Sequence, residues 1–176
     1  MKFGFFGFPH LGGTYSVFRN LRLGLAPQGI ELQWLSASAE AHAAAQGAFF
    51  RAEQAYGQLV GKPGDAPQAQ ARALHGVLAN DGFDGVIVNV LADPVETNIV
   101  RYLPPRLVRV MIVHNITPGT YAAAAAIRDY VHATVAISPR MRDDLIVRYG
   151  FRPERLKLIP HGVARSPAPR IRRPQG

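Results

Sequence analysis

Short runs of apolar residues alternate along the chain with longer segments in which apolar side chains recur every three or four positions. The short runs are rich in Val, Ile and Phe, as β-strands are, whereas the longer segments have the spacing of helices that bury one face. Strands that alternate with helices in this order are typical of a parallel sheet joined by crossover helices. The pattern therefore predicts an α/β fold built on such a sheet.

The pattern also gives the residue ranges of the strands and helices. The predicted strands cover residues 2–8, 30–35, 85–91, 107–113, 133–137 and 156–159. The predicted helices cover residues 14–26, 39–60, 68–78, a segment that begins after Asp93, 117–129 and 138–149. The segment over residues 39–60 is assigned to one helix because alanine, the best helix former, dominates it.

Three of the helix starts carry capping signals. Asp93, Thr117 and Ser138 can each accept a hydrogen bond from the first helical turn, and each is followed by a proline, which fits the first helical position. Glu96 lies three residues after Asp93, where it is expected to complete a capping box. In the segment Ser138-Pro139-Arg140, the start of a capped helix explains the serine and the proline. Only Arg140 is then left as a candidate for a functional role.

The C-terminal residues differ in composition from the rest of the chain. Residues 164–176 contain three prolines, four arginines and no acidic residue, so half of the formal net charge of +8 lies there and +4 remains for residues 1–163. A polar segment broken by prolines does not pack into a core. We therefore predict one domain over residues 1–163 and an extended basic linker or tail over residues 164–176.

Composition excludes several classes of protein. The chain has no cysteine, which excludes disulfide scaffolds, thiolate zinc sites and cysteine nucleophiles. Charged residues interrupt every long apolar run, so no segment has the roughly 18 apolar residues that a membrane-spanning helix needs. The apolar run after Lys2 is short and lacks a small-residue cleavage site, which argues against a signal peptide. The cytoplasm is therefore the expected location.

Several enzyme motifs are excluded by spacing. No two glycines lie two positions apart, so the dinucleotide fingerprint Gly-x-Gly-x-x-Gly is absent, and no lysine follows a phosphate-binding glycine loop. The histidines are never within five residues of one another, and no serine occupies a Gly-x-Ser-x-Gly turn. The sequence thus offers no support for a hydride-transfer, P-loop, zinc-protease or local serine-hydrolase site.

Polar residues at the ends of predicted strands are the remaining candidates, because α/β sheets bind ligands at the carboxyl ends of their strands. Gly12 and Gly13 lie between the first strand and the first helix, where backbone N–H groups could contact an anion. His10 adds a titratable donor to the same loop. The alternatives are a tight turn for the glycine pair and a solvated loop position for His10, and both remain open from these residues alone.

His114 directly follows a strongly apolar strand, so its side chain is expected at the carboxyl edge of the sheet. There it could donate to a hydroxyl group or stabilise developing charge. The alternative is a hydrogen-bonded histidine that only ends the strand. Asn115 and Thr117 follow in the same loop and either share the site or shape the turn.

Four segments, taken in order, resemble a known family. They are the Gly12-Gly13 loop, Val113-His114-Asn115, Ala136-Ile137-Ser138 and Leu158-Ile159-Pro160-His161-Gly162-Val163. Their order and spacing resemble the N-terminal domain of group 1 (family 4) glycosyltransferases over residues 1–163. The last segment is similar to the family's Ile-Pro-Asn-Gly-Val, with His161 in place of Asn.

The resemblance implies the N-terminal half of a GT-B enzyme, in which two Rossmann-like domains face a cleft. A sugar would pass from a nucleotide-sugar donor to a sugar or lipid-linked acceptor with retention of anomeric configuration, and no metal or other cofactor is expected. The family's roles place His114 near the transferred sugar as the catalytic residue, and Gly12 and Gly13 at the donor diphosphate. The residues expected to line the acceptor side of the cleft are His10, Thr14, Asn115 and Thr117.

One departure from the family bears on activity. The family's donor-binding Glu-x7-Glu motif and its basic diphosphate contacts lie in a C-terminal domain, and no two glutamates of this chain are eight residues apart. The 176 residues alone are therefore expected to be inactive and to need a donor-binding domain in the same or a separate chain.

Two alternatives come from other functional classes. The first is a stand-alone module that binds a sugar or lipid acceptor, or regulates, without catalysis. The second assigns function to the arginine-rich tail, which could dock on an anionic membrane or on nucleic acid at about 1 kcal/mol for each basic residue. The prediction includes peripheral contact with the inner face of a membrane and no nucleic-acid partner.

Overall fold

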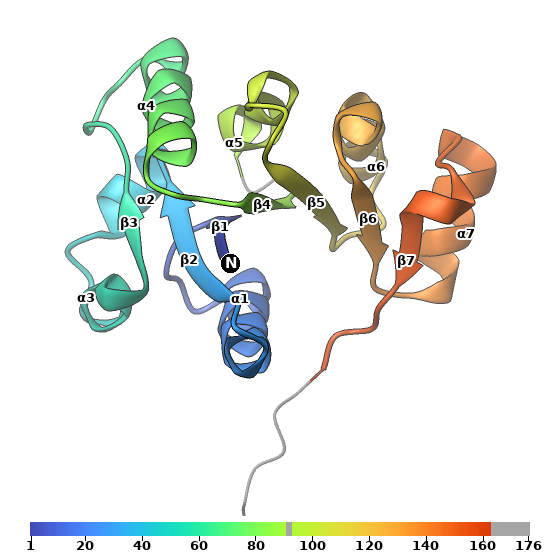
Figure 1. Cartoon of the computed structure of the whole chain (residues 1–176), viewed down its shortest axis with the longest axis horizontal. Coiled ribbons are helices and arrows are strands. Elements are labelled where there is room, and N and C mark those ends of the chain that lie inside the picture. The colour runs from blue at the N-terminus through green and yellow to red at the C-terminus, as the bar shows by residue number, and fades with distance from the viewer. Residues whose placement is uncertain (91–92, 163–176) are drawn as a thin grey trace, which may run out of the picture.

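The computed structural model describes residues 1–90 and 93–162, which form one sheet with helices on both faces (Figure 1). The strands are β1 (Lys2–Phe6), β2 (Glu31–Ser36), β3 (Gly57–Leu59), β4 (Gly85–Asn89), β5 (Val108–Val113), β6 (Ala133–Ala136) and β7 (Leu156–Leu158). Their order across the seven-stranded sheet is β3-β2-β1-β4-β5-β6-β7, and every neighbouring pair is parallel. The predicted α/β class is therefore confirmed.

The strands are connected mainly by helices, as the alternating pattern predicts. The α-helices are α1 (Gly13–Leu25), α2 (Ala39–Ala44), α3 (Ala48–Glu53), α4 (Pro67–Asn80), α5 (Pro94–Asn98), α6 (Pro118–Ile127) and α7 (Pro139–Tyr149). Short 3-10 turns are η1 (Ala26–Gln28), η2 (Gln54–Tyr56), η3 (Ile99–Tyr102), η4 (Arg128–Tyr130) and η5 (Pro153–Arg155). Within the described ranges no helix is long and apolar enough to cross a membrane.

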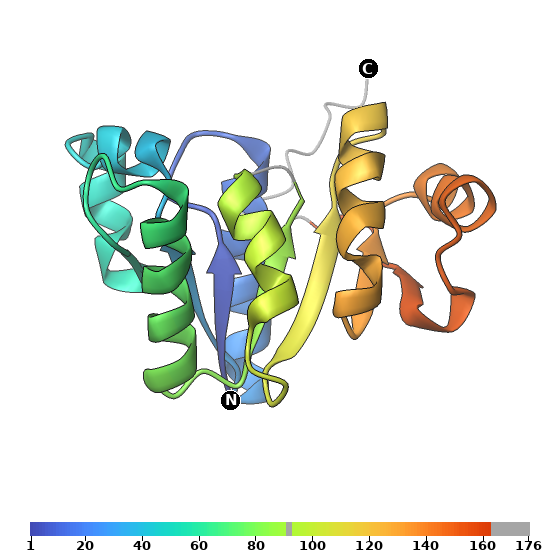
Figure 2. The ribbon, with the colours of Figure 1, turned by 90° about the horizontal axis from the view of Figure 1, so that it is seen from above.

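The two faces of the sheet carry separate apolar cores. α4, α5, α6 and α7 lie along one face, and Figure 2 shows α4 to α6 side by side in front of the strands. Side chains of these helices, including Leu78, Tyr121 and Leu145, pack in one buried cluster with Val86 and Val88 of β4. Every residue of β4 is buried, as expected for a central strand of a parallel sheet.

The opposite face is covered over only part of its width. α1 and α3 pack on β1 and β2 through an aromatic cluster in which Phe18 lies 5.3 Å from Phe5 and 5.1 Å from Tyr15, measured between ring centroids. Further across the same face, Val110 of β5 and Val135 of β6 are only partly buried. The described helices therefore leave the β4–β6 side of this face open.

Residues 39–60 form two short helices, turn η2 and edge strand β3, so the prediction of a single helix was wrong. Gly47 has an extended backbone, with φ −70° and ψ 143°, and separates α2 from α3. The indole N–H of Trp34 and the hydroxyl of Tyr15 then donate to the backbone oxygen and the carboxylate of Glu53, each at 3.0 Å. β3 follows and pairs with β2, whose outer backbone groups would otherwise lack partners. These tertiary contacts override the helix propensity of alanine.

The remaining predicted strands and helices agree with the structure to within two residues at each end, where both ends are described. Thr117 and Ser138 cap α6 and α7 by accepting from the N–H groups of Thr120 and Met141. Gly150, with φ 66°, ends α7 in the left-handed conformation that favours glycine. Two parts of the prediction, the tail over residues 164–176 and the last residue of the strand over 85–91, lie outside the described residues.

The capping box predicted at the start of α5 is only half right. Asp93 Oδ1 accepts from the N–H groups of Val95 at 2.7 Å and Glu96 at 3.1 Å, so the cap itself is confirmed. Glu96 does not return to the helix end. Its Oε1 instead accepts from the hydroxyl of Ser36 at 2.5 Å and the N–H of Ala37 at 3.2 Å, at the end of β2.

Candidate functional site

A polar cavity of about 300 Å³ opens at the carboxyl ends of β1, β4 and β5. β1 lies between β2 and β4, so the strand order reverses beside it, and α/β proteins bind ligands at such a switch point. The polar side chains around the cavity come from strand ends, the loops that follow them and the first turns of α1, α2 and α5. They are His10, Thr14, Tyr15, Ser38, Glu40, Asn89, Glu96, His114 and Asn115.

Asn89, the last residue of β4, joins β1 to His114 through its side-chain amide. Its Nδ2 donates to the backbone oxygen of Phe6 at 2.7 Å, which fixes the orientation of the amide. Its Oδ1 is then left to accept from Nε2–H of His114 at 2.8 Å. Because Asn89 is only 1% exposed, these bonds are shielded from water. They place the proton of His114 on Nε2 and leave Nδ1 as an acceptor.

The imidazole of His161 stacks on His114, with 5.3 Å between ring centroids and 17° between ring planes. Nε2 of His161 lies 3.3 Å from Nδ1 of His114 and donates to it. Burial, and secondly the neighbouring His161, lower the pKa of His114 to about 4. His114 is therefore neutral at pH 7, with one strong hydrogen bond inside the protein and one long, weaker one at the cavity edge.

His10 organises the loop between β1 and α1. Its Nδ1 accepts from the N–H of Gly12 at 2.9 Å, so its Nε2–H donates to the hydroxyl of Thr14 at 2.9 Å. A Cβ on Gly12 would lie 2.5 Å from His10 Nδ1, so any other residue there would displace the imidazole. Burial lowers the pKa of His10, and the charge of Glu40 partly opposes this effect. His10 is a structural part of the loop as well as a lining residue.

Glu96 places a carboxyl group in the wall of the polar cavity, although only 1% of the residue is exposed. Burial raises the pKa of this carboxyl to about 7, and the charge of Asp93 adds to the increase. The hydrogen bonds from Ser36 and Ala37 act in the opposite direction because they favour the ionised form. Near neutral pH the cavity therefore contains a carboxyl that is balanced between its two protonation states.

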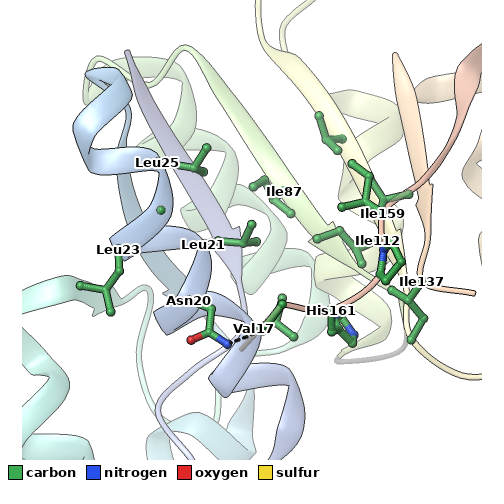
Figure 3. A pocket seen from close by; sticks show the side chains of 15 residues that line it. Val17, Asn20, Leu21, Leu23, Leu25, Ile87, Ile112, Ile137, Ile159 and His161 are labelled. Atoms are coloured by element: carbon green, nitrogen blue, oxygen red, sulfur yellow. Dashed lines mark hydrogen bonds between the residues drawn. The ribbon is translucent and has the colours of Figure 1, made fainter. Parts of the chain in front are cut away.

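A second cavity of about 630 Å³ lies between α1 and the open side of the sheet (Figure 3). Its walls are mainly aliphatic. They include Val17, Leu21 and Leu25 of α1, and Ile87, Val110, Ile112, Val135, Ile137 and Ile159 across from them. The side chain of Asn20 donates to the backbone oxygen of Gly162 at 3.1 Å and so ties the end of the described chain to α1. His161 borders this apolar cavity and contacts His114, which lines the polar cavity.

The structure brings four of the seven predicted site residues together, because His10, Thr14, His114 and Asn115 all line the polar cavity. The other three do not line it. The N–H of Gly12 donates to Nδ1 of His10. Gly13 faces open space, since a Cβ built on it would meet nothing within 4 Å. The hydroxyl of Thr117 accepts from the N–H of Thr120. Their predicted roles toward the donor and the acceptor remain predictions.

Other residues that line the polar cavity, or that contact its lining, were not predicted from the sequence. Asn89 ends an apolar strand, and a polar residue in that position was the available signal for it. Ser36 and Ser38 alternate at the end of β2, while Glu96 carried a capping signal that hid its tertiary role. His161 was noted only as a departure from a motif. Its contact with His114 joins residues 47 positions apart and no local pattern could reveal it.

The polar cavity suits a ligand rich in hydroxyl groups. It offers neutral imidazoles, hydroxyls, amides and a carboxyl, all of which exchange hydrogen bonds with such groups. Within residues 1–90 and 93–162, no group of three His, Asp or Glu side chains is arranged to hold a metal ion.

Comparisons with known proteins bear on the family and the fold of the chain. The family model for Glycosyltransferase Family 4 matches residues 11–166. A glycosyltransferase from Rickettsia africae has a similar structure, with a TM-score of 0.64 and 13% identity, over 92% of this chain and 43% of that protein. MurG from Acinetobacter baumannii is also similar, with a TM-score of 0.55 and 13% identity, over 96% of this chain and 47% of that protein.

The chain thus spans less than half the length of either solved protein. At this identity the structural likeness supports the fold, which corresponds to about half of a GT-B enzyme. A search of curated protein sequences gave no match.

Proposed function

Because the chain belongs to glycosyltransferase family 4, we propose that it is the acceptor-side half of a GT-B enzyme that transfers a sugar from a nucleotide-sugar to an acceptor with retention of configuration. The donor nucleotide would bind in a second domain, supplied by the same or a separate chain. A sugar or a lipid-linked sugar is the proposed acceptor.

One observation carries this proposal, namely the position of His114 at the switch point of the sheet. Its Nε2–H is committed to Asn89, whereas its Nδ1 makes only the 3.3 Å contact with His161 at the edge of the cavity. In the complex, a hydroxyl of the transferred sugar would replace His161 and donate to Nδ1. A neutral imidazole held in one tautomer by a buried amide is preorganised for this role.

The proposed chemistry explains why a second domain is needed. When the sugar leaves its nucleotide, negative charge accumulates on the diphosphate and must be stabilised by positioned donors. In this half the loop at Gly12 and Gly13 is the predicted contribution. The N–H of Gly12 already donates to His10, so binding of a diphosphate there would require His10 to turn away. A facing domain would supply further donors and exclude water, which strengthens each contact.

The engaged Gly12 amide also favours a second candidate function. A domain whose loop offers its amide to His10 can bind an acceptor without binding a donor. In that case the chain is an acceptor-binding or regulatory module without catalysis. The two candidates differ in turnover rather than in acceptor binding.

The experiment uses the endogenous polypeptide, purified from its native cell with an antibody against residues 1–162, with any chain that copurifies. It is offered a panel of nucleotide-sugars together with sugar and lipid fractions from the same cell, and release of nucleoside diphosphate is measured. We expect turnover with one donor, and a loss of at least about 100-fold in the His114→Ala variant, as removal of a positioned catalytic group produces.

The matched control is His75→Ala, which removes a histidine from α4, away from both cavities. It should retain full turnover. Full turnover in His114→Ala would remove His114 from the site, and acceptor binding without turnover toward any donor would favour the binding module. An inverted anomeric configuration in the product, read by NMR, would contradict the retaining mechanism.

A further inference from the structure

The polar cavity differs in charge from the protein that surrounds it. The chain carries 20 Lys and Arg residues and a formal net charge of +8, yet none of the described residues that line this cavity is Lys or Arg. The carboxyl-bearing side chains in the lining are Glu40 and Glu96. The cavity therefore lacks the basic groups that bind phosphate, and a phosphate placed in it would face acidic groups instead.

Glu96 is the buried carboxyl of this cavity, and one of its two oxygens has no hydrogen-bond partner among the described residues. Its Oε1 accepts from Ser36 and Ala37, and these two bonds hold the carboxyl in place. Its Oε2 receives no hydrogen bond from any residue in the described ranges. The residue is only 1% exposed and borders the cavity, so a ligand hydroxyl that donates to Oε2 would supply a hydrogen bond that no described residue provides.

The buried and half-buried polar groups nearby are engaged with one another, whereas Glu40 and Asn115 are exposed. Asn89 uses its amide for Phe6 and His114, and His10 uses both ring nitrogens within its own loop. Ser38 accepts from the N–H of Ala41. Thr14 accepts from His10, which leaves its hydroxyl proton free to donate. Groups of this kind are matched by neutral hydroxyls, which both donate and accept.

We infer that Glu96 determines acceptor specificity: its Oε2 accepts a hydrogen bond from a hydroxyl of an uncharged polyol, and the cavity rejects the corresponding phosphate ester. This inference rests on the proposed function for the assignment of the ligand as an acceptor. It goes further by naming the binding residue and the charge of the part of the acceptor that enters the cavity.

The electrostatics of the site support the inference. Asp93 at the start of α5 acts on the charge of Glu96, and the other titratable groups that line the cavity are Glu40, His10, Tyr15 and His114. Asp93 raises the pKa of Glu96, while burial lowers the pKa of both histidines and keeps them neutral. A hydroxyl that donates to Oε2 stabilises the ionised carboxyl, so a bound polyol should lower the pKa of Glu96.

The test compares neutral polyols with their phosphate esters on the 176-residue protein. Glucose, mannose, galactose, N-acetylglucosamine and inositol, and the monophosphate of each, are titrated to 100 mM. Binding is followed through the NMR signals of the His10 and His114 rings and of the Glu96 carboxyl. We expect at least one neutral polyol to shift these signals and to bind at least tenfold more tightly than its phosphate. Its binding should also lower the pKa of Glu96.

Glu96→Gln should weaken binding of that polyol at least tenfold, because an amide in place of the ionised carboxyl is a weaker acceptor. Glu154→Gln removes the same charge from an exposed position in η5 and should leave binding unchanged. If Glu96→Gln does not fold, Ser36→Ala provides the second variant. It removes one bond to Oε1, and the pKa of Glu96 should then rise above 7 while polyol binding weakens.

Three results would overturn the inference: no shift with any neutral polyol, equal or tighter binding of the phosphates, or unchanged polyol binding in Glu96→Gln. Because the measurement reads binding and not transfer, it is independent of the turnover assay. Retained polyol selectivity without turnover would mean that the proposed enzyme function had failed. Turnover without polyol selectivity would mean that the inference about Glu96 had failed.

Discussion

The polar cavity and the apolar cavity are lined by two histidines that contact each other, His114 and His161, yet their walls are held in place by different forces. In the polar cavity a chain of hydrogen bonds runs from the backbone of Phe6 through Asn89 to His114. In the apolar cavity the aliphatic side chains of α1 and of β4, β5 and β6 face one another, and the hydrogen bond drawn there runs from Asn20 to the backbone of Gly162 (Figure 3). Directional bonds fix the position and tautomer of each group, whereas aliphatic walls select only for shape and apolar surface.

This difference indicates where specificity is encoded. A ligand of the polar cavity must match a fixed set of donors and acceptors, and an unmatched buried group costs about 1–3 kcal/mol. The apolar cavity lies where the described helices leave one face of a parallel sheet uncovered. Such sheets are ordinarily covered on both faces. The following predictions test the contrast between the two regions, from the largest expected effect to the smallest.

The pH dependence of stability should separate two opposing titrations in the polar cavity. The pKa of Glu96 is raised from 4.5 to about 7, so as pH rises this carboxyl loses its proton in the unfolded chain before it does so in the folded protein. The free energy of unfolding therefore falls by about 3 kcal/mol between pH 4.5 and 7. The pKa of His114 is lowered from 6.5 to about 4, so as pH falls this imidazole gains a proton in the unfolded chain before it does so in the folded protein. Stability therefore rises by about 3 kcal/mol from pH 4 to 6.5 through this group. The two effects largely cancel in the wild type.

Single variants should reveal each titration alone. In Glu96→Gln the free energy of unfolding should rise steeply with pH between about 4 and 6.5, with His10 adding to the rise because its pKa is also lowered. In His114→Gln it should fall between about 4.5 and 7. Urea unfolding followed by the fluorescence of Trp34, the chain's single tryptophan, measures both profiles. Parallel profiles in the two variants would contradict the assigned protonation states.

Removal of the buried amide should have the next largest effect. Asn89→Ala leaves the oxygen of Phe6 and Nε2–H of His114 without their partner, so we expect a loss of about 2–3 kcal/mol at pH 7. Asn98→Ala is the matched control. It removes an exposed amide that donates to the backbone of Pro94, and should cost no more than about 0.5 kcal/mol. Equal losses in urea unfolding would show that the hydrogen-bond chain does not stabilise the site.

The same contrast explains how much the sequence could predict. The alternation of strands and helices is a local pattern, and the position of His114 follows from it because the residue directly ends an apolar strand. The role of Asn89 depends on Phe6, 83 residues away, and that of Glu96 on Ser36, 60 residues away. Side-chain bonds over such separations leave no periodic signal.

The segment after β2 was mispredicted for a related reason. Its alanines favour a helix, and nothing local shows that Gly57–Leu59 is needed as a partner for the edge of β2. The open apolar face was equally hidden. A strand buried on both faces and a strand with one uncovered face have the same apolar composition, so the sequence does not distinguish β4 from β5 and β6.

The smallest effect is expected at the rim of the apolar cavity, where two leucines of α1 form a matched pair. Leu21 faces the strands, and placing a lysine there should cost about 2 kcal/mol because apolar burial is lost. Leu23 is 57% exposed and points away from the strands (Figure 3), so Leu23→Lys should change the free energy of unfolding by no more than about 0.5 kcal/mol. Urea unfolding at pH 7 compares the two. If Leu23→Lys were as costly as Leu21→Lys, the rim would be covered in solution, and the contrast between a closed polar site and an open apolar cavity would fail.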